Sequence, residues 1–247
     1  MRLFLISLFL FVCASSFAKV GISDRTGEIL DTKTFHFFDE SGKNISLASY
    51  FSPNKSVLLV PVFYNCSSVC NIVLVNLVQT LKQINFSPGR AFEVVVFSFD
   101  PSDIASLALA KKKSYLHLYE RPETADGWHF LTGDAANIQA LTQAIGFDYE
   151  LDKASGQFSH AAAIYVLSPE GKISAIFPGS EYPRKELQIA LQEATLGKLQ
   201  IFLHRASAFC YAYMLHPGIL NSPLRWFLLV FGIFFVLLTW RFRKILK

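Results

Sequence analysis

The sequence predicts an α/β domain that lies between two hydrophobic chain ends. Apolar runs of strand length alternate with segments of helical period from Val57 to Ala194. Hydrophobic residues make up 52% of the 247 residues, and part of that share belongs to apolar segments at the two ends. The formal net charge of +4 is modest, and the basic residues are not clustered with aromatic ones, so we expect no nucleic-acid partner.

The central stretch of the domain is a strand, a turn and a helix. Val57 to Tyr64 is a continuous apolar run, which predicts a buried strand, and residues 65–68 form a turn. The apolar positions after this turn recur at intervals of three and four and predict a helix: Leu74, Leu77, Val78, Leu81 and Ile84.

The remaining elements continue the alternation. The predicted strands are Thr34–Phe38, Phe92–Phe99, Trp128–Leu131, Ala161–Leu167 and Lys172–Phe177. The predicted helices are Ile104–Leu118, with a basic exposed face at Lys111, Lys112 and Lys113, then Asp134–Ile145, which stops at Gly146, and Arg184–Ala194. Residues 120–127 are a polar loop, and residues 168–171 make the hairpin turn between the last two strands. This order is that of a thioredoxin-like fold.

Two cysteines, Cys66 and Cys70, lie where the central strand meets its helix. An offset of four residues places two side chains on one helix face, where they can share a metal ion or form a disulfide. The first turn of a helix also favours a thiolate over a thiol, and the thiolate is both the metal ligand and the nucleophile. The alternative is a pair of small buried residues with no chemistry.

His160 comes directly before the predicted strand Ala161–Leu167, and in a thioredoxin-like fold that position faces the cysteine turn. Two thiolates and one imidazole form a soft, low-coordinate site, which suits Cu(I) and also accepts Cu(II). Zinc could bind the same three residues, but a structural zinc site would need a fourth ligand, and none is obvious in the sequence. The alternative is an ordinary polar residue at a strand edge.

The N-terminus, residues 1–18, is expected to be a secretory signal. It has one Arg, an apolar core from Leu3 to Val12, and small residues before a cleavage site after Ala18. Cys13 would leave with this signal, and an uncleaved anchor is the alternative. Export would place the mature chain in an oxidising compartment.

The C-terminus is expected to anchor the domain, residues 19–196, in the inner membrane. Residues 197–222 form a connector, residues 223–242 a transmembrane helix with Trp226 and Trp240 as an aromatic belt, and residues 243–247 a basic cytoplasmic tail. The domain would then face the periplasm. The alternative for the apolar segment is a buried core helix.

From about Thr34 to Ala194 the chain resembles the Sco/SenC family of copper-binding, thioredoxin-like proteins. The motifs that carry this resemblance are VFYNCSSVC at residues 62–70, FSFDP at 97–101, HFLTGD at 129–134, GFDYE at 146–150 and FSHAAAIYVLSPEGKI at 158–173. The resemblance implies assembly of the copper A centre of cytochrome c oxidase, with the copper A subunit as partner. The protein would deliver copper or keep the cysteines of that subunit reduced.

Several positions depart from the family pattern. Ser67 and Asn71 stand where members usually have prolines, and Ser159 stands where many have Asp. Some bacterial members carry a Cys-aromatic-His-aromatic segment before a C-terminal anchor, and Ala212 replaces the His in Cys210-Tyr211-Ala212-Tyr213 here. The other soft or imidazole donors near that anchor are His204, Met214 and His216. We expect this stretch to be a connector rather than a second metal site.

Three functions remain open on the sequence. The first is a copper metallochaperone, a binding protein rather than an enzyme, with Cys66, Cys70 and His160 as ligands. The second is a thiol-disulfide oxidoreductase in which Cys66 and Cys70 cycle between dithiol and disulfide. The third is a peroxidase-like thiol enzyme, for which the residues around Cys66 offer no clear peroxide pocket.

Overall fold

The computed structural model describes residues 20–65, 69–154 and 156–196 of the chain. The expected signal, connector, transmembrane helix and tail lie outside these residues, so they stay predictions. Within the described ranges, no helix is both long and apolar enough to cross a membrane. The described residues up to Leu191 form one compact unit, and the fold below is that of this unit, with its last helix continuing to Thr195.

A five-stranded sheet in the order β10-β9-β4-β5-β6 forms the centre of this unit. The strands are β4 (Ser56–Val62), β5 (Phe92–Ser98), β6 (Trp128–Leu131), β9 (Ala163–Leu167) and β10 (Ile173–Pro178). The first three run parallel, β9 runs antiparallel to β4, and β10 runs antiparallel to β9. All residues of β4, β5 and β9 are buried, as their continuous apolar sequences require when helices cover both faces.

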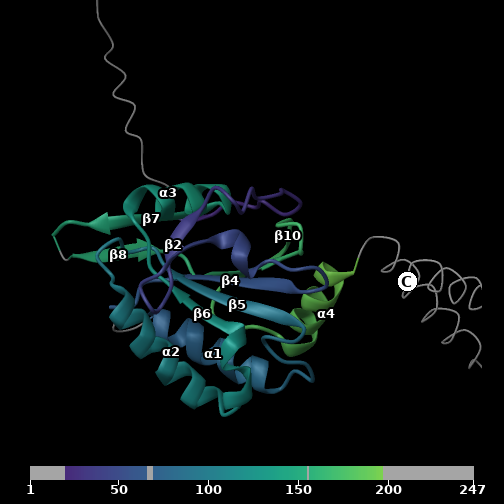
Figure 1. The fold of residues 1–247 in the computed structure, drawn as a ribbon. Coiled ribbons are helices and arrows are strands. Elements are labelled where there is room, and N and C mark those ends of the chain that lie inside the picture. The colour runs from purple at the N-terminus through teal and green to yellow at the C-terminus, as the bar shows by residue number, and fades with distance from the viewer. Residues whose placement is uncertain (1–19, 66–68, 155, 197–247) are drawn as a thin grey trace, which may run out of the picture. The chain divides into compact units, whose positions relative to one another are not determined.

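Four helices accompany this sheet: α1 (Val69–Lys82), α2 (Ala105–Tyr119), α3 (Ala135–Ala144) and α4 (Arg184–Thr195). Helices α1 and α2 pack side by side over one face, and α3 lies on the opposite side (Figure 1). The apolar positions that predict α1 are all buried, because they face the sheet: Leu74, Leu77, Val78, Leu81 and Ile84. At α3, Asp134 accepts a hydrogen bond from the Asn137 amide, and Gly146 provides the positive φ, +69°, that ends the helical segment.

Smaller elements surround this sheet. A three-stranded sheet has the order β1-β7-β8, with β1 (Gly21–Ile22), β7 (Phe147–Asp152) and β8 (Gln157–His160). A hairpin joins β2 (His36–Phe38) to β3 (Asn44–Ser46), and two short 3-10 helices are η1 (Leu47–Tyr50) and η2 (Pro122–Gly127). In Figure 1 the β7–β8 hairpin extends away from the central sheet.

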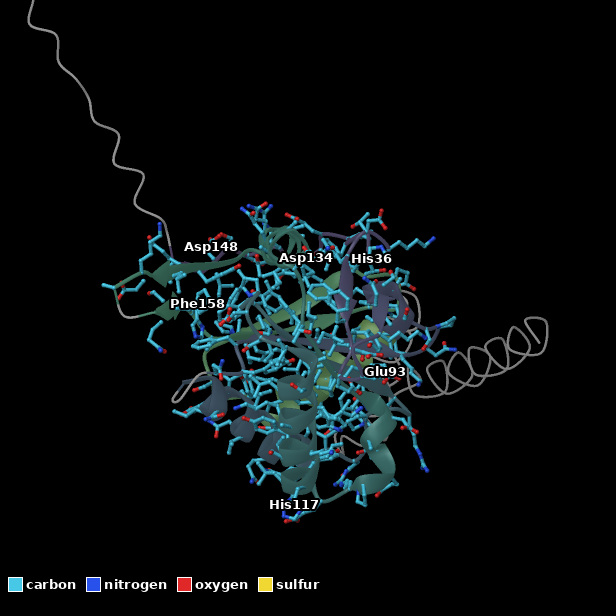
Figure 2. All side chains as sticks on the ribbon, turned by 60° about the vertical axis from the view of Figure 1, so that its left-hand side comes forward. His36, Glu93, His117, Asp134, Asp148 and Phe158 are labelled. Carbon is cyan, nitrogen blue, oxygen red and sulfur yellow. The ribbon has the colours of Figure 1, made fainter. Side chains whose placement is uncertain are left out.

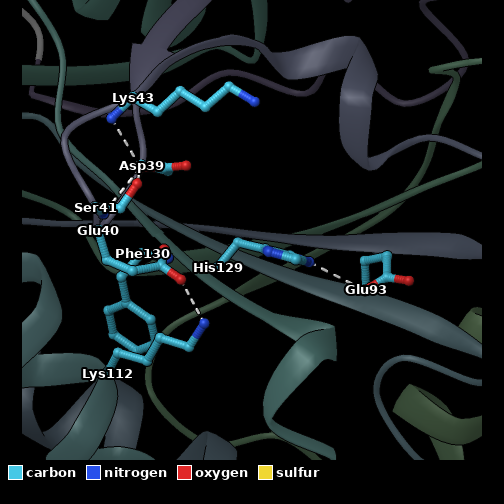
Figure 3. Close-up of polar contacts among 8 residues, drawn as sticks. All are labelled: Asp39, Glu40, Ser41, Lys43, Glu93, Lys112, His129 and Phe130. Atoms are coloured by element: carbon cyan, nitrogen blue, oxygen red, sulfur yellow. Dashed lines mark hydrogen bonds and ion pairs between the residues drawn. The ribbon is translucent and has the colours of Figure 1, made fainter.

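The thioredoxin-like α/β fold is confirmed, with three corrections. The strand predicted from Ala161 begins at Ala163, and the residues before it form a separate strand, β8, that pairs with β7. The predicted polar loop 120–127 contains the short helix η2. Lys112 does not belong to an exposed basic face, because its ammonium group pairs with Glu40, and only 17% of each side chain is exposed (Figure 3).

Candidate functional site

The end of β4 leads into the cysteine turn, and hydrogen bonds fix it on three sides. The Phe99 amide donates to the Val62 carbonyl at 2.8 Å, which extends the pairing of β4 with β5. The Tyr64 amide donates to Asp103 Oδ2 at 2.7 Å, and the Tyr64 hydroxyl donates to the Leu131 carbonyl at 2.8 Å. Tyr64, two residues before Cys66, is therefore held by both its main chain and its side chain.

The structure describes the main chain of one of the two cysteines, Cys70, but not that of Cys66. Cys66 is outside the described residues, and Cys70 is the second residue of α1, so its main chain lies in the first helical turn. The next residue, Asn71, accepts a hydrogen bond from the Tyr115 hydroxyl at 3.0 Å. The expected position of Cys70 at a helix start is therefore confirmed, whereas its distance from Cys66 stays a prediction.

His160 is the last residue of β8 and lies opposite Tyr149 of β7. Its Nδ1 is 2.8 Å from the Ala161 carbonyl oxygen, and a carbonyl can only accept, so the proton sits on Nδ1 and the ring's lone pair on Nε2. Burial lowers the pKa of His160 below its ordinary value, although the bond to Ala161 opposes this shift. The lowered pKa favours the neutral imidazole, which is the form that binds metals.

Aromatic rings place His160 against the end of β4. Its ring centroid lies 5.0 Å from that of Phe99, 5.8 Å from that of Phe63 and 6.1 Å from that of Phe147. Phe63 is three residues before Cys66, so the structure brings His160 to the chain that leads into the cysteine turn. That His160 faces the cysteine turn itself stays a prediction, because Cys66 lies outside the described residues. His160 belongs to the β7–β8 hairpin rather than to the start of β9.

The same rings form a wider aromatic cluster, made by Phe63, Phe99, Phe147, Tyr149 and Phe158, that packs around His160. Figure 2 shows Phe158 on the hairpin, well apart from Glu93 at the start of β5. Sequence reasoning missed this cluster. The only signal was the high Phe content, 24 residues.

A pocket of about 450 Å³ opens next to the cysteine turn on the α2 side. Its lining combines polar and apolar side chains: Asn65, Ser102, Asp103, Ile104, Ser106, Leu107 and Ala110. Burial raises the pKa of Asp103, against the hydrogen bonds that it receives from Ser98 and Tyr64. Asn65 directly precedes Cys66, so this pocket lies beside the expected reactive turn.

Within the described ranges, no group of three or more His, Cys, Asp or Glu residues could hold a metal ion. A site that includes Cys66 lies beyond that search. The membrane-proximal donors Cys210, Met214, His204 and His216 also lie outside the described residues.

No curated protein matches this chain in sequence. Among solved structures, the chain is similar to Arabidopsis thaliana ScoI with copper bound, at 19% identity over 68% of this chain and 96% of that one, with a TM-score of 0.52. A SCO1/SenC family lipoprotein from Bacillus anthracis shares 20% identity over 70% of this chain and 100% of that one, with a TM-score of 0.55. BsSco, described as a member of the Sco family of cytochrome c oxidase assembly proteins, shares 23% identity over 71% and 99%, with a TM-score of 0.54.

These structural likenesses agree on the fold. The SCO1/SenC family model matches residues 24–195, which include the cysteine turn, all four helices and the histidine hairpin. The chain therefore belongs to the SCO1/SenC family.

Proposed function

We propose that this protein binds copper as cargo through Cys66, Cys70 and His160 and delivers it to the copper A centre during assembly of cytochrome c oxidase. Family membership supports this function, as do the copper carried by the Arabidopsis relative and the assembly role stated for BsSco. The partner would be the oxidase subunit that holds the copper A centre.

The placement of His160 is the observation that carries the proposal. The His160 imidazole, whose Nδ1–H is bonded to Ala161 and whose lowered pKa favours the neutral form, lies beside Phe63, which follows β4 and precedes Cys66 by three residues. Two thiolates alone can hold Cu(I) in a linear arrangement, whereas Cu(II) prefers more ligands and a nitrogen donor. His160 therefore contributes most to the Cu(II) form.

Each cysteine must lose its proton before it can bind copper, so copper affinity should fall as the pH drops through the thiol pKa values. The start of α1 favours the thiolate at Cys70, because unpaired N–H groups and the positive dipole end lie there. The Nδ1–H bond to Ala161 fixes the orientation of the His160 ring.

Copper titration of the full chain tests this function. Wild type should bind one copper ion per chain, and His160→Ala should weaken Cu(II) far more than Cu(I). His117→Ala is the control, because His117 is exposed in the last turn of α2, far from the hairpin (Figure 2). If His160→Ala keeps the wild-type Cu(II) absorption spectrum and affinity, His160 is not a ligand.

A thiol-disulfide oxidoreductase is the second candidate, and the position of Cys70 in the first turn of α1 favours it. This function needs the two cysteines but not His160. Mild oxidation should remove two hydrogens from the peptide that holds Cys66 and Cys70, as mass spectrometry would show. Pairing of either cysteine with Cys210 instead would contradict this redox pair.

We also propose that a C-terminal helix tethers the domain on the periplasmic side of the inner membrane. The basic residues after Trp240 should then remain in the cytoplasm. A reporter that works only after export should be silent when fused after Lys247. Activity of that fusion would contradict this topology.

A further inference from the structure

Helix α2 and the residues just before it contact the chain on both sides of the cysteine turn. Before the turn, Asp103 Oδ2 accepts the Tyr64 amide at 2.7 Å. After the turn, the Tyr115 hydroxyl donates to Asn71 Oδ1 at 3.0 Å. Tyr64 lies two residues before Cys66 and Asn71 one residue after Cys70, so the two contacts bracket both cysteines.

The two bracketing side chains are themselves held in place. Asp103 is 5% exposed, and its Oδ2 also accepts the Ser98 hydroxyl at 2.6 Å, which ties it to the end of β5. Tyr115 is 6% exposed, and its ring stacks on Phe130 of β6 with 6.1 Å between centroids and 10° between planes. The Tyr64–Asp103 hydrogen bond is buried and the Tyr115–Asn71 hydrogen bond is partly buried, and a hydrogen bond removed from water is electrostatically stronger than an exposed one.

We propose that Asp103 and Tyr115 are positioning residues that clamp the two flanks of the cysteine turn and so set how often the Cys66 and Cys70 thiols meet. The proposal rests on the proposed function only in taking these two cysteines as the working pair. Asp103 and Tyr115 act on the residues that flank the two cysteines. They act through the Tyr64 main chain and through the Asn71 side chain.

The effect of this clamp can be measured as the equilibrium constant for oxidation of the Cys66 and Cys70 dithiol by glutathione disulfide. One cysteine thiolate attacks glutathione disulfide, forms a mixed disulfide and releases one glutathione thiolate. The second cysteine thiolate then attacks the protein sulfur of that mixed disulfide, closes the Cys66–Cys70 bond and releases the second glutathione. The equilibrium constant measures the effective concentration of one thiol near the other, which falls when the flanks loosen.

The experiment uses the full chain with Cys13→Ser and Cys210→Ser, so that only Cys66 and Cys70 remain. Tyr115→Phe keeps the ring stack and removes the hydroxyl. It should lower the equilibrium constant about fivefold, as expected for the loss of one hydrogen bond of about 1 kcal/mol, which raises the midpoint potential by about 20 mV. The matched control is Tyr182→Phe, which also removes one hydroxyl bond, to the Gly179 carbonyl at 3.2 Å, and should leave the constant unchanged.

Two variants at Asp103 separate position from charge. Asp103→Asn keeps a carbonyl oxygen that can accept the Tyr64 amide, so its equilibrium constant should stay within about twofold of wild type. Asp103→Ala removes the acceptor and should lower the constant at least about fivefold. If Asp103→Ala does not fold, Tyr115→Phe and Asp103→Asn still decide the matter.

Three results would overturn the clamp. One is a Tyr115→Phe constant that equals that of the Tyr182→Phe control. Another is an Asp103→Asn constant at least about fivefold below wild type, which would mean that Asp103 acts through its charge. The third is a wild-type chain in which Cys66 and Cys70 form no disulfide. The glutathione equilibrium is measured without copper. A chain that fails to bind copper would therefore refute the proposed function, whereas the clamp would still be tested by the equilibrium constants.

Discussion

Replacing Phe99 tests whether the aromatic side chains around His160 hold its ring in place for copper binding. Phe99 directly follows β5, is fully buried, and lies at the centre of the aromatic cluster. Its centroid distances are 4.9 Å to Tyr149, 5.0 Å to His160, 5.3 Å to Phe147, and 5.5 Å to both Phe63 and Phe158. Phe99→Ala therefore removes the aromatic ring that packs closest to the His160 ring.

The expected loss of stability from Phe99→Ala is large. Replacing a buried Phe by Ala typically costs about 3–5 kcal/mol. Each aromatic pair adds about 0.5–1.5 kcal/mol beyond the buried area, so we expect the upper end of that range. For a domain of this size, about 5 kcal/mol corresponds to a fall in Tm of roughly 10–20 °C.

Phe99→Ala should also lower the affinity for Cu(II), because Phe99 packs against the ring of the proposed ligand His160. Groups that orient a ligand typically change metal affinity about 10- to 100-fold when removed. Phe99→Ala should therefore weaken Cu(II) binding by about that factor, measured by competition titration well below the Tm of the variant.

Phe92→Ala is the matched control for Phe99→Ala. Phe92 is also fully buried, at the opposite end of β5, where it packs against Phe86 at 5.8 Å. The control should lose comparable stability and keep the wild-type Cu(II) affinity. If both variants lose affinity equally, the aromatic cluster has no specific role in holding His160. If Phe99→Ala keeps the wild-type Cu(II) affinity, the position of the His160 ring does not depend on packing against Phe99.

Two further predictions concern the scaffold. Burial alone would raise the pKa of Glu93, but hydrogen bonds from His129 and Lys55 (the His129 contact is drawn in Figure 3) outweigh it and hold the pKa below its ordinary value. The contribution of ionised Glu93 to the free energy of unfolding is fully present above the ordinary carboxyl pKa. It is lost as the pH falls through the lowered pKa of Glu93 in the folded protein. Glu93→Gln should thus be about 1–3 kcal/mol less stable than wild type in urea at pH 7, and equal to it in acid. Gly127→Ala would put a Cβ 2.0 Å from a main-chain nitrogen and should cost about 3 kcal/mol, whereas Gly21→Ala meets no atom within 4 Å and should leave Tm unchanged.

The central sheet and helix α1 could be predicted because their signals are local. The residues of β4 and β5 are buried on both faces, so both strands are mostly apolar in sequence. Helix α1 faces the sheet with one stripe, so Leu74, Leu77 and Leu81 recur at helical spacing. Both patterns can be recognised without knowledge of the rest of the chain.

The histidine hairpin could not be predicted in the same way. Only the first residue of β7 is buried, and β8 has none that is fully buried, so neither strand has a strong apolar pattern. The contacts of His160 come from residues far apart in sequence, Phe63, Phe99 and Phe147. Lys112 was misjudged for the same reason, because its partner Glu40 lies 72 residues away.

The three proposed ligands are held by different physical means, and this difference makes their contributions separable. The flanks of Cys66 and Cys70 are attached through hydrogen bonds to Asp103 and Tyr115. His160 sits on a strand at the edge of its sheet and is placed mainly by ring packing. Loss of Phe99 should therefore impair Cu(II) and spare two-thiolate Cu(I) binding, whereas loss of the clamp should impair both, because both copper states need the paired thiols.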